Sequence, residues 1–180
     1  SPRAWWMLRA MGHEQVAVLD GGLRAWIAAG FATIDSLQLD SPAGNFEAIY
    51  TEDSFCDFSV VLASLEDPSC AILDARSSGR FYGTAPEPRA GIRGGHMPNA
   101  RNLPFSKLLN EGSMKPVAEL QEIFNEFITD DERLIASCGS GLTACILTFA
   151  AYLAGHRNLS VYDGSWIEWG APSKLPVVTD

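Results

Sequence analysis

The sequence alternates short apolar segments with longer segments whose apolar residues recur at helical spacing. The short segments "CAILDAR" (70–76), "RLIAS" (133–137) and "LSVYDG" (159–164) have the length of strands. The longer segments "PVAELQEIFNEFI" (116–128) and "LTACILTFAAYLA" (142–154) predict helices. Strands that alternate with helices favour a parallel sheet with helices on both faces. We therefore predict an α/β fold.

Three further segments complete this pattern. The segment "SFCDFSVVLASLED" (54–67) predicts a helix, and "WIEWG" (166–170) predicts a last helical turn. A loop rich in Gly, Pro and Arg covers residues 77–99. Ligands of parallel sheets bind at the carboxyl ends of the strands. We expect the site where Cys138 and the loop after Asp74 meet.

One unit of the sequence occurs twice. "MGHEQVAVLDGGLRAW" (11–26) matches "AGHRNLSVYDGSWIEW" (154–169) at a constant offset of 143 residues. The second copy follows well over a hundred residues, whereas the first follows only one helical segment, "PRAWWMLRAM" (2–11). The first copy is therefore expected to be the tail of another domain, in which "VAVLD" (16–20) forms a strand.

The segment "SCGSGLTA" (137–144) places a cysteine where a strand ends and a helix is about to begin. Gly139 and Gly141 let the backbone curl, so that the amides of residues 139–144 can form an anion-binding nest at the helix N-terminus. Such a position lowers the pKa of a thiol, and we expect Cys138 to be a thiolate. The alternative is a buried structural cysteine before a glycine turn.

Net charge and hydropathy exclude several classes of protein. A net charge of −9 argues against nucleic-acid binding, which requires a basic face. The apolar runs are too short to span a bilayer, and the first residues lack the features of a secretion signal, so a soluble, cytoplasmic protein is expected. Between Arg76 and Arg101, however, five arginines stand against the single acid Glu87. This arginine-rich stretch could hold a small anion.

The other three cysteines predict structural roles. Cys56, Cys70 and Cys145 lie in apolar contexts, and the sequence has neither a C-x-x-C pair nor histidines at zinc-ligand spacing. We expect reduced thiols, as in a cytosol-like compartment, and no metal site.

Four motifs together resemble the catalytic domain of the 3-mercaptopyruvate sulfurtransferases, which form part of the rhodanese family. They are the "CGSGLTA" loop, the "LDAR" strand end followed by Arg80, "PEPRAGIRGGHMPNARNLPF" (86–105) and "VYDGSWIEWG" (161–170). The resemblance implies a rhodanese-like fold, a five-stranded parallel sheet with helices on both faces. It also implies a C-terminal remnant of a non-catalytic domain at 1–31, a linker at 32–48 and a catalytic domain at 49–175.

The resemblance also implies a reaction. Cys138 would take sulfane sulfur from 3-mercaptopyruvate, hold it as a persulfide and pass it to a thiol such as thioredoxin or to cyanide, with release of pyruvate and without a cofactor. It assigns Cys138 and Ser140 to catalysis, Arg80 and Arg89 to substrate binding, Gly139, Ser140, Gly141, Leu142, Thr143 and Ala144 to persulfide stabilisation, and Asp74 and Arg76 to support of the loop.

Single residues of the site have plainer alternatives. Arg80 and Arg89 could be solvated or structurally paired arginines, and Ser140 could be a turn residue. Thr143 is expected to cap the following helix and to bond the cysteine sulfur. His96 is expected to bond the backbone of its own loop.

Three rival functions share the fold. Thiosulfate sulfurtransferases usually carry basic residues after the cysteine, where this chain has Gly139 and Ser140. Phosphatases of this fold need an arginine at position 144, which is alanine here. Non-catalytic modules typically lose the cysteine that this chain keeps. These differences favour mercaptopyruvate as the donor.

The first 31 residues are expected to need a partner. One helix, one strand and one turn cannot by themselves pair the strand or bury Trp5, Trp6, Val16, Val18 and Trp26. We expect the rest of the first domain, in the same protein or in a separate chain, to cover them.

Overall fold

A computed structural model describes residues 2–36 and 42–179 of the chain. Residues 37–41 of the predicted linker lie outside this part. The elements are, in order, α1 (Pro2–Ala10), α2 (Gly22–Ala28), β1 (Phe55–Cys56), α3 (Phe58–Ser64), β2 (Cys70–Asp74), α4 (Ser78–Phe81), β3 (Arg101–Asn102), the 3₁₀ helix η1 (Phe105–Leu108), β4 (Leu109–Asn110), β5 (Ser113–Met114), α5 (Val117–Asn125), β6 (Arg133–Ser137), α6 (Ala144–Ala154), β7 (Leu159–Tyr162) and α7 (Ser165–Trp169).

The main sheet has five parallel strands in the order β1-β7-β6-β2-β3, which confirms the predicted fold class. The register pairs Asp74 at the end of β2 with Ser137 at the end of β6. The loop after Asp74 and the loop that begins at Cys138 therefore leave the sheet side by side, at its carboxyl edge. A separate antiparallel pair, β4 and β5, lies beside the sheet.

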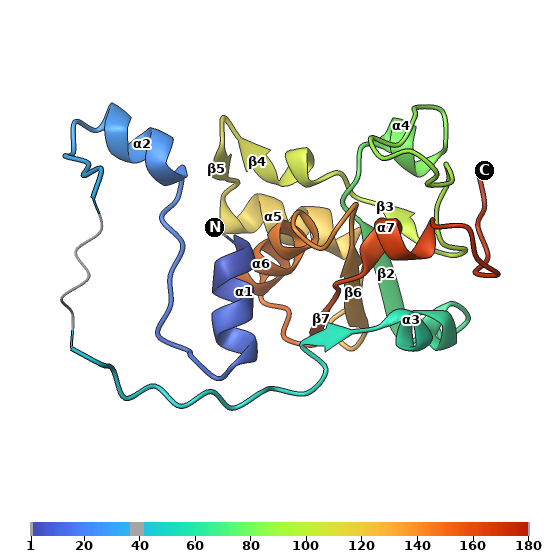
Figure 1. The fold of residues 1–180 in the computed structure, drawn as a ribbon, viewed down its shortest axis with the longest axis horizontal. Coiled ribbons are helices and arrows are strands. Elements are labelled where there is room, and N and C mark those ends of the chain that lie inside the picture. Colours follow the sequence, from blue (N-terminus) through green and yellow to red (C-terminus); the bar gives the residue numbers. More distant parts are fainter. Residues whose placement is uncertain (1, 37–41, 180) are drawn as a thin grey trace.

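Helices cover both faces of this sheet (Figure 1). Helices α1, α5 and α6 pack over one face, and their apolar residues join Leu73, Leu134 and Val161 in a common core. Helices α3 and α7 pack over the other face, where Ile72 and Ile135 lie. Successive strand residues thus point into different cores, which explains why the strands read as continuous apolar runs rather than as alternating ones.

The segment 54–67 differs from its predicted single helix. It begins with the short edge strand β1, and α3 starts only after Asp57. Asp57 caps α3, because its carboxylate accepts the amides of Ser59 at 2.9 Å and Val60 at 3.2 Å. An N-cap residue adopts an extended conformation and so separates a strand from a helix. The sequence pattern did not resolve this boundary.

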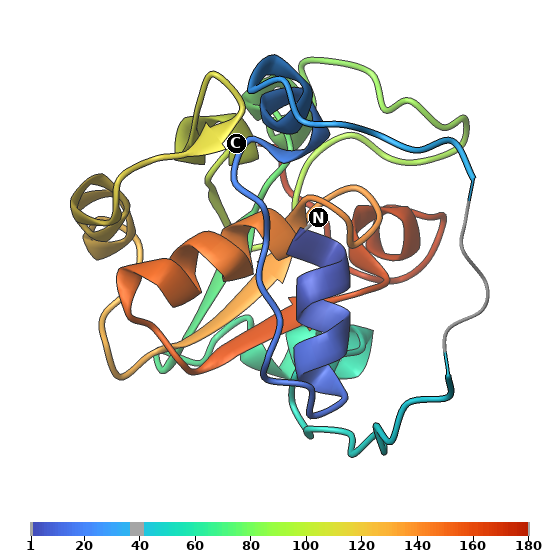
Figure 2. The same ribbon diagram turned by 90° about the vertical axis from the view of Figure 1, so that its left-hand side faces the viewer.

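Helix α1 folds onto the domain that carries the sheet, as Figure 2 shows. Trp5 meets the rings of Phe149 and Tyr152 on α6 at centroid distances of 4.9 and 5.1 Å. Trp5 and Trp6 are only 3% and 7% exposed. The expectation that these two tryptophans need a separate partner is therefore wrong. Truncating a buried tryptophan costs about 3–5 kcal/mol, so this contact is a substantial part of the fold.

The remainder of the first copy of the repeat is less integrated. Residues 16–20 do not form the predicted strand, because no strand of the sheet lies beside them to accept their hydrogen bonds. Val16 and Val18 still pack against the core, whereas Trp26 on α2 stays 38% exposed. Across the described ranges, no helix is long and apolar enough to cross a membrane.

Candidate active site

The loop between β6 and α6 carries Cys138. Only 1% of Cys138 is exposed, whereas the next two residues, Gly139 and Ser140, reach the surface. Gly141 has a φ of +75°, and a Cβ there would lie 2.5 Å from Asp163 Oδ1. Glycine is therefore required at 141, both by the backbone conformation and by the close approach of the neighbouring loop.

Ser165 at the start of α7 holds this loop in shape. Its hydroxyl accepts the amides of Cys138 at 3.2 Å and of Gly141 at 3.0 Å, and it donates to the carbonyl of Tyr162 at 2.7 Å. The next amides of α7, those of residues 166 and 167, donate to the carbonyls of Cys138 and Gly139 at 2.9 and 3.0 Å. Sequence reasoning missed Ser165, although its position three residues after the end of β7 places it at the same sheet edge as Cys138.

The predicted nest of amides is formed only in part. The amide of Gly141 is bonded to Ser165, so it is not available to an anion. The amides of Gly139, Ser140, Leu142 and Thr143 donate to no acceptor among residues 2–36 and 42–179. These amides can still receive an anion that enters the loop.

Thr143 does not cap α6 as predicted. It has helical dihedral angles, φ −78° and ψ −19°, and its side chain makes no capping hydrogen bond. A capping side chain reaches back to the helix amides only from an extended backbone, which explains the failure. The contact to the sulfur of Cys138 comes instead from the hydroxyl of Ser165, at 4.0 Å.

Helix α1 also touches the loop. The Arg3 side chain donates to the carbonyl of Gly141 at 3.2 Å and forms an ion pair with Asp163. No local pattern predicts this contact, because the two partners are 138 residues apart. The first segment of the chain therefore fixes the middle of the Cys138 loop directly.

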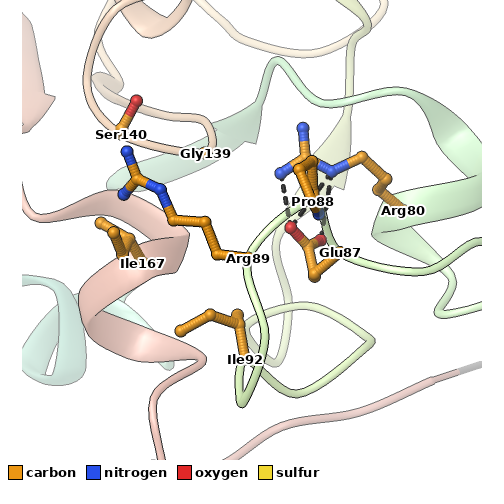
Figure 3. Close-up of a pocket in the computed structure, with 8 residues that line it drawn as sticks. All are labelled: Arg80, Glu87, Pro88, Arg89, Ile92, Gly139, Ser140 and Ile167. Carbon is orange, nitrogen blue, oxygen red and sulfur yellow. Dashed lines mark hydrogen bonds and ion pairs between the residues drawn. The ribbon is translucent and has the colours of Figure 1, made fainter.

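A cavity of about 230 Å³ opens beside Gly139 and Ser140 (Figure 3). The Arg89 side chain extends across the cavity toward Ser140. Ile167 of α7 also lines the cavity. The structure thus brings together the predicted residues Arg80, Arg89, Gly139 and Ser140. The full lining consists of Arg80, Glu87, Pro88, Arg89, Ile92, Gly139, Ser140 and Ile167.

Glu87 binds two of the arginines. Its carboxylate lies 2.5 Å from Arg80 Nη2 and 2.9 Å from Arg76 Nη1, and its side chain is only 5% exposed. Sequence reasoning noted Glu87 only as an isolated acid. The guanidinium of Arg80 also passes over Gly139, where a Cβ would come within 3.1 Å of Nη2. Arg80 is thus a paired arginine at the edge of the loop.

Arg76 and Asp74 form a buried ion pair below the loop. Arg76 Nε lies 2.9 Å from Asp74 Oδ2, and both side chains are almost completely buried. Arg76 also donates to the carbonyl of Gly95 at 2.8 Å and stacks on Trp166, 4.1 Å from the ring centroid. Removing one partner of such a pair costs about 3–5 kcal/mol, because a buried charge is left without compensation.

The arginine-rich stretch is not one anion site. Arg76 and Arg80 are paired with carboxylates, and Arg93 donates to main-chain carbonyls of residues 169, 170 and 175. Arg101 lies apart, 4.0 Å from Glu132. Within the described residues, Arg89 has neither an ion-pair nor a hydrogen-bond partner, and it is exposed.

His96 bonds the backbone of its own loop, residues 77–99, as expected. Its Nδ1 lies 3.1 Å from the carbonyl of Phe81 at the end of α4, and its ring stacks on that of Phe81 at 3.8 Å. This contact joins the two ends of the loop. His96 thus anchors the far end of the loop that carries Arg89.

The four cysteines are all free thiols. Burial raises the pKa of Cys145 to about 12, and burial likewise raises that of Cys56 to about 12. Cys145 Sγ contacts the carbonyl of Gly141 at 3.2 Å. Both residues fit the predicted structural role. In the described part of the chain, no three His, Cys, Asp or Glu side chains gather as metal ligands would.

Comparisons with known proteins identify a family and several relatives of this chain. A family model, the rhodanese-like domain, matches residues 58–172. The 3-mercaptopyruvate sulfurtransferase of Mus musculus is 42% identical over 94% of this chain and 57% of its own length. A thiosulfate sulfurtransferase of Rattus norvegicus is 40% identical over 94% of this chain and 58% of its own length.

Among solved structures, SseA of Escherichia coli, a 3-mercaptopyruvate sulfotransferase, superposes with a TM-score of 0.76. It is 36% identical to this chain, and the match covers 92% of this chain and 62% of SseA. The chain therefore spans about three fifths of the length of the relatives that it matches.

Proposed function

The chain belongs to the rhodanese family, and from this premise we propose that it is a sulfurtransferase that takes sulfur from 3-mercaptopyruvate onto Cys138. The observation that carries the proposal is that the loop after Cys138 lies next to a cavity. The amides of this loop are partly without acceptors in the described residues, and Arg89, likewise without a partner there, extends into the cavity. A thiol nucleophile, anion-binding amides and a guanidinium for the donor carboxylate are the groups that this reaction needs.

The chemical step is a nucleophilic attack on sulfur. The thiolate of Cys138 forms a bond to the sulfur of the donor while the carbon–sulfur bond breaks. The electron pair of that bond passes to the methylene carbon, and pyruvate leaves as its enolate. The donor's thiol proton balances the step when it reaches the enolate carbon, which leaves pyruvate and an anionic persulfide on Cys138. The unoccupied amides after Cys138 stabilise this persulfide.

The lining residues support distinct roles. Arg89 binds the donor carboxylate as a two-pronged donor. Ser140, exposed at the cavity edge, donates to the ketone or to the enolate that develops from it. Arg80 stays paired with Glu87 and lends part of its charge to the loop across Gly139. Asp74 and Arg76 support the loop from below.

The charge of the cavity favours a monoanionic donor. Arg80 and Arg89 contribute two positive charges and Glu87 removes one, so the lining carries a net charge of about +1. Thiosulfate is a dianion, and the loop offers it no basic residue at positions 139 and 140. The rat thiosulfate sulfurtransferase is nevertheless similar to this chain. Thiosulfate is therefore the second donor to be tested.

A thiol such as that of thioredoxin, or cyanide, takes the sulfur from the persulfide without an organic cofactor or a metal. Residues 49–175 form the catalytic domain, onto which α1 packs, and residues 1–31 are the end of a preceding domain. A reduced thiol nucleophile fits a cytoplasmic protein.

Intact-mass spectrometry tests the reaction. On addition of 3-mercaptopyruvate, the protein should gain one sulfur atom on the peptide that contains Cys138, and pyruvate should appear in equal amount. Cys138→Ser should gain none, whereas Cys145→Ser should gain the same amount as the unmodified protein. Sulfur on the Cys138→Ser variant would refute the mechanism.

A further inference from the structure

Helix α7 connects the two loops that form the cavity. At its N-terminal end, Ser165 and the amides of residues 166 and 167 bond the Cys138 loop. Ile167 of the same helix lines the cavity together with Ile92 from the loop that carries Arg89. Any movement of that loop relative to α7 therefore changes the distance between Arg89 and Cys138.

Arg93 binds the other end of α7. Its Nη2 donates to the carbonyl of Trp169 at 2.8 Å, its Nε to that of Gly170 at 3.3 Å, and its Nη1 to that of Leu175 at 3.0 Å. The last carbonyls of a helix have no partner within the helix, and a cation is favourable there. The guanidinium thus supplies hydrogen bonds to the carbonyls at the C-terminal end of α7 and in the chain that follows it.

The main chain of Arg93 strengthens the same link. Its amide donates to the carbonyl of Gly170 at 2.9 Å, and its carbonyl accepts Trp166 Nε1 at 2.8 Å. Two residues further on, the tail lies against Gly95, where a Cβ would come within 2.3 Å of the Val178 carbonyl. The loop is therefore attached to α7 and the tail at residues 93–95, and Arg89 lies only four residues before this attachment.

We propose that Arg93 is a positioning residue, which sets the place of Arg89 relative to Cys138 by tying the Arg89 loop to α7. This inference rests on the proposed function for the role of Arg89. The Cys138 loop keeps its own contacts to Ser165 and to the α7 amides when Arg93 is lost. Loss of Arg93 should therefore weaken donor binding and leave the chemistry of Cys138 unchanged.

Kinetics of two Arg93 variants test this separation. In Arg93→Met, the KM for 3-mercaptopyruvate should rise about tenfold while kcat stays within about twofold, because binding is lost and the chemical step is kept. Arg93→Lys should not restore KM, since one ammonium group cannot reach three carbonyls in the fixed directions of a guanidinium. Arg101→Met, in β3 and outside the cavity, is the matched control and should leave both constants unchanged.

Alkylation of Cys138 gives a readout that does not require sulfur transfer. Iodoacetate is an anion and iodoacetamide is neutral. The ratio of the iodoacetate rate to the iodoacetamide rate therefore reports the position of the Arg89 charge. The ratio should fall in Arg93→Met and in Arg89→Met, while the iodoacetamide rate of Arg93→Met stays unchanged.

The outcomes separate the two proposals. An unchanged ratio and KM in Arg93→Met, or equal changes of both alkylation rates, would overturn the role of Arg93. An unchanged ratio in Arg89→Met would overturn it too, because Arg93 would then have nothing to position. A lower ratio in a protein that gains no sulfur from 3-mercaptopyruvate would support Arg93 and refute only the proposed function.

Discussion

Glu87 forms an ion pair with Arg80 at the edge of the cavity, where Arg80 Nη2 and Glu87 Oε2 lie 2.5 Å apart. The same carboxylate binds the buried Arg76. Of the two arginines expected to hold the donor, only Arg89 is therefore unpaired in the described residues. The Glu87 carboxylate therefore lowers the net positive charge of the cavity lining from about +2 to about +1.

Neutralising Glu87 should change donor preference. In Glu87→Gln the net charge of the lining rises from about +1 to about +2, which favours a dianion. The ratio of kcat/KM for thiosulfate to that for 3-mercaptopyruvate should rise roughly five- to tenfold, as expected for one added charge near a surface. Steady-state kinetics with both donors measures this ratio. A ratio that does not change would show that Glu87 has no part in the choice of donor.

The same variant should also lose stability. Arg76 keeps Asp74 as its partner but loses a charge-assisted hydrogen bond in a buried setting. The free energy of unfolding should fall by about 1–3 kcal/mol. Urea unfolding measures the change, and Glu122→Gln, an exposed acid on α5 that does not line the cavity, serves as control.

A lysine at position 140 should move preference toward thiosulfate. Ser140 is exposed, so Ser140→Lys adds a cation without displacing a neighbour and removes the proposed donor to the ketone. Gly139 is a poorer place for this change, because its Cβ would meet the Arg80 guanidinium. Ser140→Gln separates loss of the hydroxyl from gain of charge. Equal donor ratios in the lysine and glutamine variants would contradict the charge argument.

Removing the hydroxyl of Ser165 should loosen the Cys138 loop. Two buried amides lose their acceptor in Ser165→Ala, and the free energy of unfolding should fall by about 1–3 kcal/mol. Ser165 has a φ of +49°, so Ser165→Gly loses the same bonds but relieves the backbone and should be the more stable of the two variants. Ser106→Ala, on η1, is the control, because its exposed hydroxyl has no hydrogen-bond partner among the described residues.

Cys145 should stay inert toward alkylation. With a pKa of about 12, its thiol is ionised to roughly one part in 10⁴ at pH 8. Iodoacetamide at pH 8 should label Cys138 first, and mass spectrometry of the labelled peptides identifies the site. Faster labelling of Cys145 than of Cys138 would contradict the assignment of Cys138 as the nucleophile.

Protonation of His156 should destabilise the fold below neutral pH. Burial lowers the pKa of His156, although nearby Asp130 opposes this effect. The unfolded chain therefore takes up the proton first, so this contribution to stability is complete above the unfolded pKa of about 6.5 and is lost as the pH falls through it. Urea unfolding at pH 7.5 and 5.5 should show a smaller pH dependence in His156→Gln, whereas His13→Gln should behave as the unmodified protein.

Local patterns in the sequence were sufficient for the fold class and for the position of Cys138 in the loop between β6 and α6. The apolar runs at 70–74, 133–137 and 159–162 became strands because a continuous apolar segment of this length is stable only inside a sheet that is covered on both faces. Gly139 and Gly141 placed Cys138 in a tight loop before α6 because the backbone conformation of glycine is a local property. Such signals lie within a few residues of the element that they specify.

The tertiary structure decided everything that depends on a distant partner. The sequence presents Arg80 and Arg89 as equivalent, and only the fold shows that Glu87 pairs with the first of them. The contacts that hold the Cys138 loop come from Ser165, 27 residues later, and from Arg3, 138 residues earlier. Residues 16–20 have the pattern of a strand and form none. A strand needs a neighbour for its amides and carbonyls, and packing of the whole chain, not the segment itself, decides whether that neighbour is there.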